Sequence, residues 1–202
     1  MKLFFGKFNK FDRGFTLVET LVAIAIFSVS IIGLMSVLSS GISSTNYAKE
    51  RMIATYLAQE GIEYMRNMRD TYVLYDATDS QTGWDSFNSK VVPAPNNLCA
   101  SANGCYFDDQ NVDYTNHSQS VWKNSLSITA CNSSCPTLLY DSSTGKYGYA
   151  ASPTTTDSGF IRKISIVQPS SNETKISSTV SWTQGSGVYN ITFSESLFNW
   201  IE

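Results

Sequence analysis

The stretch that decides the fold is RGFTLVETLVAIAIFSVSIIGLMSVLSSGI, residues 13–42 of a 202-residue chain. No charged residue occurs from Thr20 to Ala48, and the single carboxylate of the stretch, Glu19, stands near its head. At about 1.5 Å of rise per residue, such a helix is long enough to cross a hydrocarbon core about 30 Å thick. A carboxylate inside the core costs roughly 2.5–3.5 kcal/mol on insertion scales, so we expect Glu19 to have a function.

A secretory signal peptide is the ordinary interpretation of an apolar N-terminal run. Its apolar core spans about 7–15 residues and ends at a small-residue cleavage site. Here the run is about twice that length, and residues 39–43, SSGIS, lack an A-x-A pattern. A plain signal anchor fits the length, but it gives no reason for Glu19 or for the Gly14-Phe15 pair.

At residues 13–19 and in the apolar helix behind them, the chain resembles the type IV prepilin family. In that family a membrane peptidase cuts after the glycine, on the cytoplasmic side, and N-methylates the new first residue. The resemblance implies a leader of residues 1–14, cleavage between Gly14 and Phe15, and methylation of Phe15. The leader is basic, which keeps the N-terminus cytoplasmic and places the rest of the chain outside. Its charges are Lys2, Lys7, Lys10 and Arg13 against Asp12.

The same resemblance implies a role for Glu19 in assembly. Cleavage creates a cationic amine on Phe15, and this amine of one subunit can meet the Glu19 carboxylate of its neighbour. Such pairing removes the cost of a lone buried charge, which is several kcal/mol. Head-to-tail contacts that do not close then give an open helical filament.

The helical pattern continues past the apolar run. We assign residues 15–42 to a transmembrane or filament-core helix and residues 43–72 to an amphipathic helix, because apolar or small residues recur at spacings of three and four. They are Ala54, Leu57, Ala58, Gly61, Ile62, Met65 and Met68. On the polar face, the spacings Glu63–Arg66 and Arg66–Asp70 support the helix. The segment at residues 57–69 resembles minor pilins of the PilV kind and GspI-type pseudopilins.

Residues 73–202 predict an extracytoplasmic loop region followed by an antiparallel sheet. Residues 73–120 are rich in Asn, Asp, Ser, Gly and Pro, which indicates a long loop. Strands are expected at residues 121–130, in a hairpin at residues 137–149, and at residues 160–167, 175–183 and 188–193, with a turn at residues 184–187. The expected fold class is α+β, with the long N-terminal helix packed on a C-terminal antiparallel sheet. The resemblance implies the same arrangement, the pilin fold.

Four cysteines fall in two local pairs, Cys99 with Cys105 and Cys131 with Cys135. An even count in a loop-rich extracytoplasmic domain indicates disulfides. Local pairing closes the shortest loops and is favoured, while the other two connectivities stay open. A structural zinc site is the rival, but its usual doublet spacing fits the second pair alone.

No catalytic constellation is evident, so we expect a non-enzyme without a cofactor. His117, the single histidine, stands in a polar loop segment without a nucleophile motif. Asp108, Asp109 and Asp113 are weak calcium candidates, since their spacing departs from an EF-hand loop and lacks its terminal Glu. Aromatic residues in or beside the loop region are expected to cap the sheet edge or to form a contact patch. They are Trp84, Phe87, Tyr106, Phe107, Tyr114 and Trp122.

Composition limits the function classes. The net charge of −3 is not the excess of positive charge that is typical of proteins that bind nucleic acid, so no nucleic-acid partner is expected. The favoured function is a minor pilin, a structural subunit of a type IV pilus-like filament. The alternatives are a pseudopilin of a type II secretion system and a filament-borne adhesin or DNA-capture subunit. The expected partners are a prepilin peptidase, other pilin or pseudopilin subunits, and the inner membrane. Before assembly the chain would cross that membrane once with its C-terminus outside, and afterwards it would lie in a surface filament or a periplasmic pseudopilus.

Overall fold

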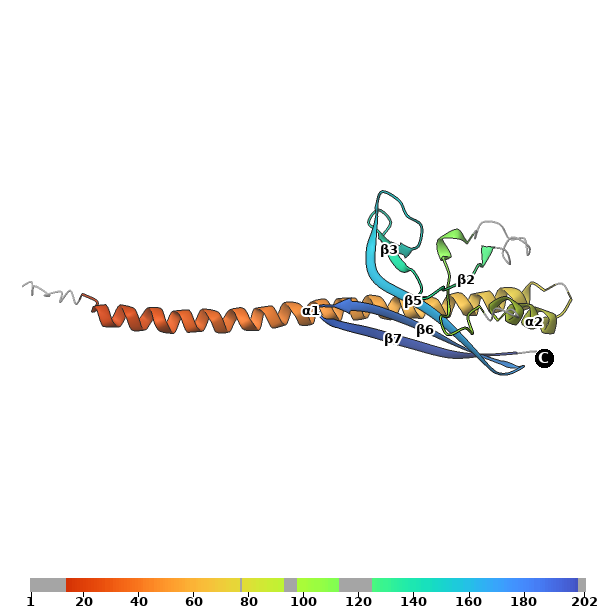
Figure 1. Ribbon diagram of the computed structural model, residues 1–202, viewed down its shortest axis with the longest axis horizontal. Coiled ribbons are helices and arrows are strands. Elements are labelled where there is room, and N and C mark those ends of the chain that lie inside the picture. The colour runs from red at the N-terminus through yellow and green to blue at the C-terminus, as the bar shows by residue number, and fades with distance from the viewer. Residues whose placement is uncertain (1–13, 77, 93–97, 113–124, 200–202) are drawn as a thin grey trace, which may run out of the picture. The chain divides into compact units, whose positions relative to one another are not determined.

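The computed structural model describes residues 14–76, 78–92, 98–112 and 125–199 (Figure 1). The chain divides into two compact units, one ending at Asn46 and one beginning at Tyr47. A single helix, α1 (Leu17–Leu74), contributes its first part to one unit and its second part to the other. Residues 1–13 of the expected leader lie outside the described residues.

In the first unit, α1 presents its large apolar side chains to the outside. Examples are Leu17 at 79% exposed, Val29 at 72% and Val37 at 73%. Among the described residues, α1 is the one helix long and apolar enough to cross a membrane. A surface of this kind requires lipid or neighbouring helices around it, because exposed apolar area is unfavourable in water.

In the second unit, α1 buries the face that its spacing predicts. All seven predicted residues, from Ala54 to Met68, are buried, and Tyr64, Thr71 and Tyr72 extend the same face. The face packs on the sheet through two clusters of buried apolar side chains. Figure 1 shows β5 (Thr155–Ser170), β6 (Glu173–Gln184) and β7 (Gly187–Phe198) alongside this part of the helix. The expected α+β arrangement of a long helix and an antiparallel sheet is therefore confirmed.

The helix approaches the sheet most closely at Gly61. A methyl group on its Cα would collide with the Oγ atom of Ser178 in β6 and reach within 3.0 Å of the side chain of Ile164 in β5. Glycine at this position therefore lets α1 lie against the strands. This contact gives a physical reason for the glycine in the segment at residues 57–69.

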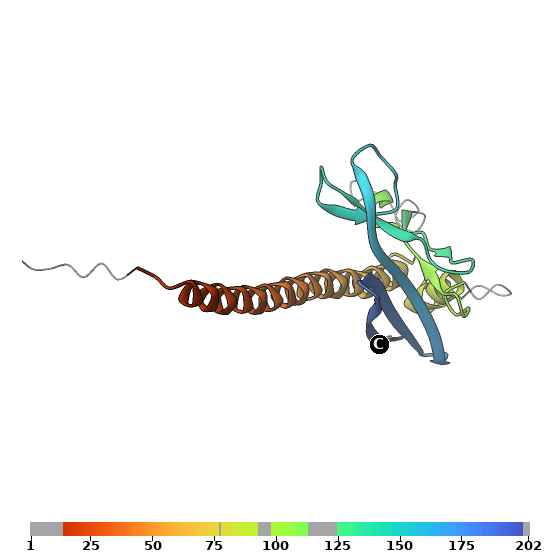
Figure 2. The ribbon, with the colours of Figure 1, turned by 60° about the vertical axis from the view of Figure 1, so that its left-hand side comes forward.

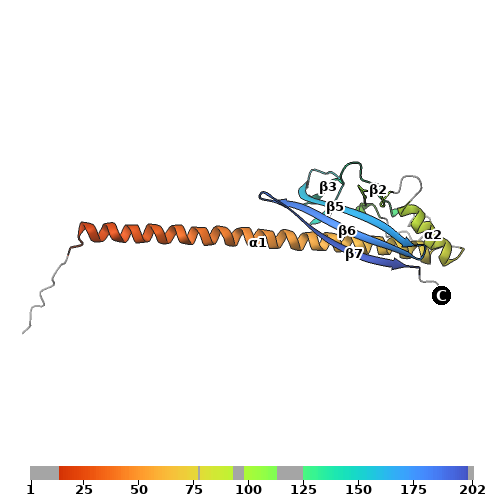
Figure 3. The ribbon, with the colours of Figure 1, turned by 60° about the horizontal axis from the view of Figure 1, so that its bottom comes forward.

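Within the described residues the sheet has seven strands, and all pairs are antiparallel. One edge is β7, which pairs with β6, and β6 pairs with β5. The other side of β5 pairs with β3 and, further along, with β1; β3 then pairs with β4 and β1 with β2. Figures 2 and 3 show β5 as the long strand that links these parts. The strands are β1 (Cys105–Tyr106), β2 (Thr129–Ala130), β3 (Thr137–Asp141), β4 (Lys146–Gly148), β5 (Thr155–Ser170), β6 (Glu173–Gln184) and β7 (Gly187–Phe198).

The predicted hairpins are confirmed. Strands β3 and β4 pair with Tyr140 opposite Tyr147, as expected for the hairpin at residues 137–149. Strands β6 and β7 pair over their full length, from Glu173 opposite Phe198 to Gln184 opposite Gly187. Gly185 in the turn has φ +59°, a left-handed conformation that favours glycine.

The long loop predicted at residues 73–120 is wrong in its first part. Helix α2 (Ser80–Val91) begins after Asp79, whose side chain accepts a hydrogen bond from Thr82 N at 2.6 Å. The sequence pattern does not reveal this helix, because its apolar face consists of only three large residues, Trp84, Phe87 and Val91, among polar neighbours. A short 3₁₀ turn, η1 (Asp109–Asn111), and strand β1 also fall within the predicted loop.

The aromatic residues of this region are mostly core residues. Trp84, Phe87 and Phe107 are at most 1% exposed, so they do not form a contact patch. Tyr114 and Trp122 lie outside the described residues. The strand predicted at residues 121–130 is too long, since only Thr129 and Ala130 of its described part are in β2.

Candidate assembly site

The N-terminal end of α1 is built around Thr16 and Glu19. Thr16 N donates to Glu19 Oε2 at 3.4 Å, and Glu19 N donates to Thr16 Oγ1 at 3.3 Å. This reciprocal pattern is a capping box, in which a threonine before the first turn and a glutamate three residues later satisfy free helix N–H groups. The T-x-x-E spacing before the apolar run signals this cap, although the sequence interpretation assigned Glu19 to assembly alone.

The residues of the predicted cleavage site flank this cap. Gly14 and Phe15 directly precede Thr16, and the Phe15 side chain is 82% exposed. Cleavage between them would put a new amine one residue before the cap and four before Glu19. The pairing of Glu19 with a neighbour's amine stays a prediction, and the structure adds the own-chain cap as a second role.

On the polar side of α1, Arg66 connects the helix to the sheet. Its Nη1 atom lies 2.6 Å from Glu63 Oε1, as the spacing of three predicts. Its Nη2 atom lies 2.6 Å from Glu195 Oε2 in β7, so the predicted pair with Asp70 is wrong. Asp70 instead pairs with Arg69 at 2.5 Å. Arg66 pairs with Glu195 because β7 lies beside the helix at this point.

A buried cation lies behind this surface. Arg162 in β5 is 1% exposed, and its Nη1 atom lies 3.0 Å from Glu60 Oε2 in α1. Its guanidinium lies 3.9 Å from the ring centre of Phe107, and Tyr64 stacks on the other side of that ring with the centres 3.7 Å apart. The cation therefore joins α1, β5 and the segment before η1.

The sequence analysis did not single out Arg162 as a buried residue, although the alternation of its strand predicts that its side chain points inward. Phe160, Ile164 and Ile166 alternate inward, and Arg162 occupies the same face. A charged residue at an inward position requires a partner, because an unpaired buried charge costs several kcal/mol.

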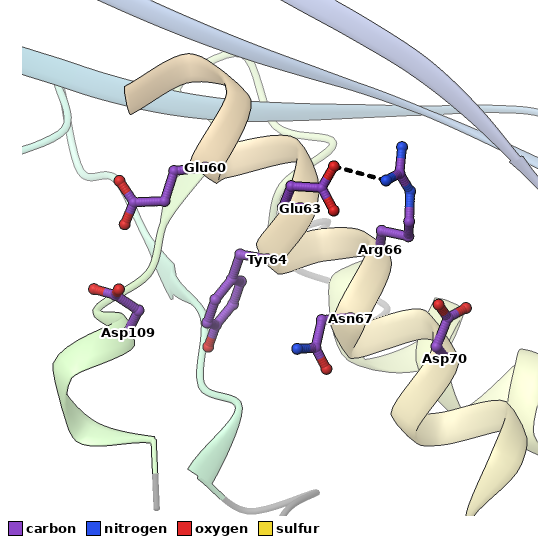
Figure 4. Close-up of a pocket in the computed structure, with 7 residues that line it drawn as sticks. All are labelled: Glu60, Glu63, Tyr64, Arg66, Asn67, Asp70 and Asp109. Carbon is purple, nitrogen blue, oxygen red and sulfur yellow. Dashed lines mark hydrogen bonds and ion pairs between the residues drawn. The ribbon is translucent and has the colours of Figure 1, made fainter. Parts of the chain in front are cut away.

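An open pocket of about 400 Å³ borders this cluster (Figure 4). Glu60 and Asp109 face one another on one side of the pocket, and the Glu63–Arg66 ion pair lies on the other. Burial raises the pKa of Glu60, the neighbouring Arg162 opposes that rise, and the nearby Asp109 carboxylate adds to it. Burial likewise raises the pKa of Tyr149 to about 12. The lining is Glu60, Glu63, Tyr64, Arg66, Asn67, Asp70 and Asp109.

The calcium candidates do not converge within the described part of the chain. Asp108 caps η1 by accepting from Gln110 N at 3.2 Å, whereas Asp109 faces Glu60. Asp113 lies outside the described residues. Among those described, no three His, Cys, Asp or Glu side chains come close enough together to hold a metal ion. Calcium binding therefore stays a prediction without support from this geometry.

The structure contains both local disulfides. Cys99 is bonded to Cys105 with Cα atoms 4.7 Å apart, and Cys131 is bonded to Cys135 at the same Cα separation. All four cysteines are buried. The first bridge lies beside β5, where Ile166 N donates to Cys99 O at 3.0 Å.

Two comparisons with known proteins give matches, each to a limited part of the chain. A family model described as the prokaryotic N-terminal methylation motif matches residues 9–35. The chain is also 47% identical over 45 residues to a protein of Vibrio cholerae serotype O1 described as type II secretion system protein I. That match covers 22% of this chain and 38% of the relative's length. No solved structure matches the chain.

The motif and the fold agree with each other. The chain carries the methylation motif across Gly14, Phe15 and Glu19, and the arrangement of helix and sheet is pilin-like. The resemblance to prepilin-like proteins, including the GspI-type pseudopilins, is thereby confirmed.

Proposed function

We propose that this chain is a structural subunit of a type IV pilus-like filament, a minor pilin that assembles through its N-terminal helix. The methylation motif at residues 9–35, at the head of an exposed apolar helix, is the observation that carries this proposal. The match to one relative spans 38% of that protein, so the role of the whole chain rests on the motif and the fold together.

The proposed sequence of events follows from the motif. A prepilin peptidase cuts between Gly14 and Phe15 and methylates the new amine. Before assembly, α1 holds the chain in the inner membrane with the second unit outside. In the filament, neighbouring helices replace lipid around the apolar surface, and Glu19 pairs with the amine of the next subunit. This role needs no cofactor, and we infer that the chain is not an enzyme.

A pseudopilin of a type II secretion system is the second candidate. The 47% identity to a type II secretion system protein I favours it. Both candidates require the same processing and the same helix, so they differ in the machine and not in the chemistry of the chain.

Two measurements test the proposal. Mass spectrometry of the N-terminus should find a chain that begins with methylated Phe15, and a mature start at Met1 or after residue 40 would contradict it. The two machines can then be separated by co-expression. A minor pilin should appear in filaments sheared from cells with pilus genes, whereas a pseudopilin should restore export in cells with secretion genes. A chain that enters neither assembly is not a filament subunit.

A further inference from the structure

Two carboxyl groups from separate segments of the second unit face one another at the pocket of Figure 4. Glu60 belongs to α1, and Asp109 is the first residue of η1. Both also line a second open space of about 550 Å³, which reaches Lys146 and Tyr147 of β4. The pair therefore lies where the segment that carries η1 meets the helix.

Among the described residues, one buried cation lies beside this pair. Arg162 is 1% exposed, and its Nη1 atom lies 3.0 Å from Glu60 Oε2. The other charged side chains of α1 at the pocket are in ion pairs of their own, namely Glu63, Arg66 and Asp70. The remaining charged or titratable groups around the cluster are Tyr64, Asp108, Lys146, Tyr147 and Tyr149. When both carboxyl groups are ionised, two negative charges therefore lie beside a single buried positive charge.

The hydrogen bonds of the pair are incomplete. Within the described part of the chain, Asp109 Oδ1 is buried without a hydrogen-bond partner, which costs free energy. Two ionised carboxylates cannot satisfy one another because both only accept hydrogen bonds, whereas one proton turns one of them into a donor. Burial raises the pKa of Glu60, Arg162 opposes that rise, and Asp109 adds to it by its charge and by a hydrogen bond. Carboxyl groups that share a site retain a proton in this way.

We propose that Glu60 and Asp109 share one proton in acidic solution and that this proton holds η1 against α1. When the proton passes to water, the two carboxylates repel one another and η1 moves away from the helix. Phe107 and Val112, on either side of η1, are 1% and 7% exposed, so they stay in the core and the movement is confined to the turn between them. This inference goes beyond the proposed function, and it holds for either candidate machine because every group lies in the second unit.

The direction of the pH dependence follows from Glu60. Because folding raises its pKa, the contact is fully present below the ordinary value of 4.5. The contact is then lost as the pH rises through the raised pKa. Opening of η1 should therefore increase from acidic to neutral solution.

Two measurements on the full chain in detergent micelles test the proposal. Carbon-13 NMR of labelled Asp and Glu carboxyl groups follows the proton, and amide hydrogen exchange at Val112 follows the movement, because Val112 N donates to Asp109 O at 3.2 Å and closes η1. At each pH, the exchange rate is divided by the rate in Asp109→Asn, so that the intrinsic pH dependence of exchange cancels. Asp108→Asn is the matched control, since it removes a charge next to the pair and keeps an oxygen that can accept from Gln110 N.

The expected result is that the Glu60 and Asp109 signals shift over the same pH range, and that the exchange ratio at Val112 rises several-fold between pH 4 and pH 7. Asp109→Asn should move the titration of Glu60 to lower pH, because Asp109 raises its pKa. Asp108→Asn should keep both results of the wild type.

Three outcomes would overturn the proposal. If Asp109→Asn leaves the titration of Glu60 where it was, the two groups share no proton. An exchange ratio that does not change with pH would mean that the proton does not hold η1. If added calcium shifts both carboxyl signals at acidic pH, a metal ion and not a proton joins the pair.

Discussion

Thr16 and Glu19 cap each other at the start of α1, through the two hydrogen bonds between the backbone N–H of each and the side chain of the other. The carboxylate that the motif assigns to assembly thus also stabilises the first turn of its own helix. An effect of removing Glu19 has two explanations, loss of the cap and loss of the intersubunit ion pair. The two are separable because glutamine can serve in a capping box but carries no charge.

We predict that Glu19→Gln impairs incorporation into filaments about as strongly as Glu19→Ala does. Both variants lose the partner of the neighbour's amine, whereas the glutamine keeps the cap. Thr16→Ala should remain largely incorporated, because losing a cap costs roughly 0.5–2 kcal/mol of helix stability. The measurement is the ratio of subunit in sheared filaments to subunit in the membrane fraction.

Processing provides the control for this comparison, and all three variants should reach the membrane and be cleaved after Gly14. Membrane insertion of the two Glu19 variants should not be impaired, since removing the only charge of the span makes insertion more favourable. If Glu19→Gln assembles like the wild type and Thr16→Ala does not, the carboxylate acts as a helix cap and not as an assembly element.

The sequence allowed the helix and the long strands to be predicted because their periodicity is strong. Seven residues at spacings of three and four identify the buried face of α1, and alternation identifies β5 and β6. Helix α2 was missed because its buried residues are few and stand among turn-forming residues. The partner of Arg66 was wrong for another reason: Glu195 is remote in the chain and only the fold brings it near. The spacing of residues within one helix cannot predict contacts between residues that are distant in the chain.

We predict that Gly61→Ala destabilises the second unit. The new methyl group would collide with Ser178 Oγ, and overpacking of this kind costs about 1–3 kcal/mol. The gain from replacing a helical glycine is only roughly 0.5–1 kcal/mol. The measurement is the free energy of unfolding, followed by the fluorescence of the buried Trp84 and Trp182.

Gly41→Ala is the matched control, because a methyl group at Gly41 meets nothing within 4 Å in the same helix. Adding Ser178→Ala to Gly61→Ala should recover part of the loss, because it removes the Oγ atom but leaves the Cβ atom of residue 178 and Ile164 Cδ1 each 3.0 Å from the new methyl group. The Ser178 hydroxyl is buried, and within the described part of the chain it has no hydrogen-bond partner. A Gly61→Ala protein as stable as wild type would contradict the close approach of α1 to β6.

We predict that a non-reducing digest yields two separate bridged peptides, one with Cys99 and Cys105 and one with Cys131 and Cys135. The bridges close loops over sequence separations of 6 and 4 residues. Replacing either pair by alanine should cost less than the ~3 kcal/mol that the chain-entropy model gives for a 15-residue loop. Free thiols in protein taken from the cell surface, or stoichiometric zinc, would refute this pairing.

The last prediction concerns the buried ion pair of Arg162 and Glu60. Arg162→Met keeps much of the side-chain volume but leaves Glu60 beside Asp109 without its cation. Because Arg162 is the largest influence that lowers the pKa of Glu60, this pKa should rise further in the variant. A carboxyl group whose pKa is raised by folding stabilises the folded state at pH values below the ordinary pKa of 4.5. This stabilisation is lost as the pH rises through the raised pKa.

The stability lost by Arg162→Met should therefore be larger at pH 7 than at pH 4. At neutral pH, removing one partner of a buried pair costs about 3–5 kcal/mol, and the exposed third of the Glu60 side chain places this case toward the lower end. At pH 4 the protonated Glu60 needs no cation, so the loss should approach the contribution of packing and of the contact with the Phe107 ring. The measurement is the difference in unfolding free energy between variant and wild type at each pH. The control repeats the substitution in a Glu60→Gln background, with the Glu60→Gln single variant as the reference, where Arg162→Met should cost the same at both pH values. A pH dependence that persists in that comparison would mean that another group titrates.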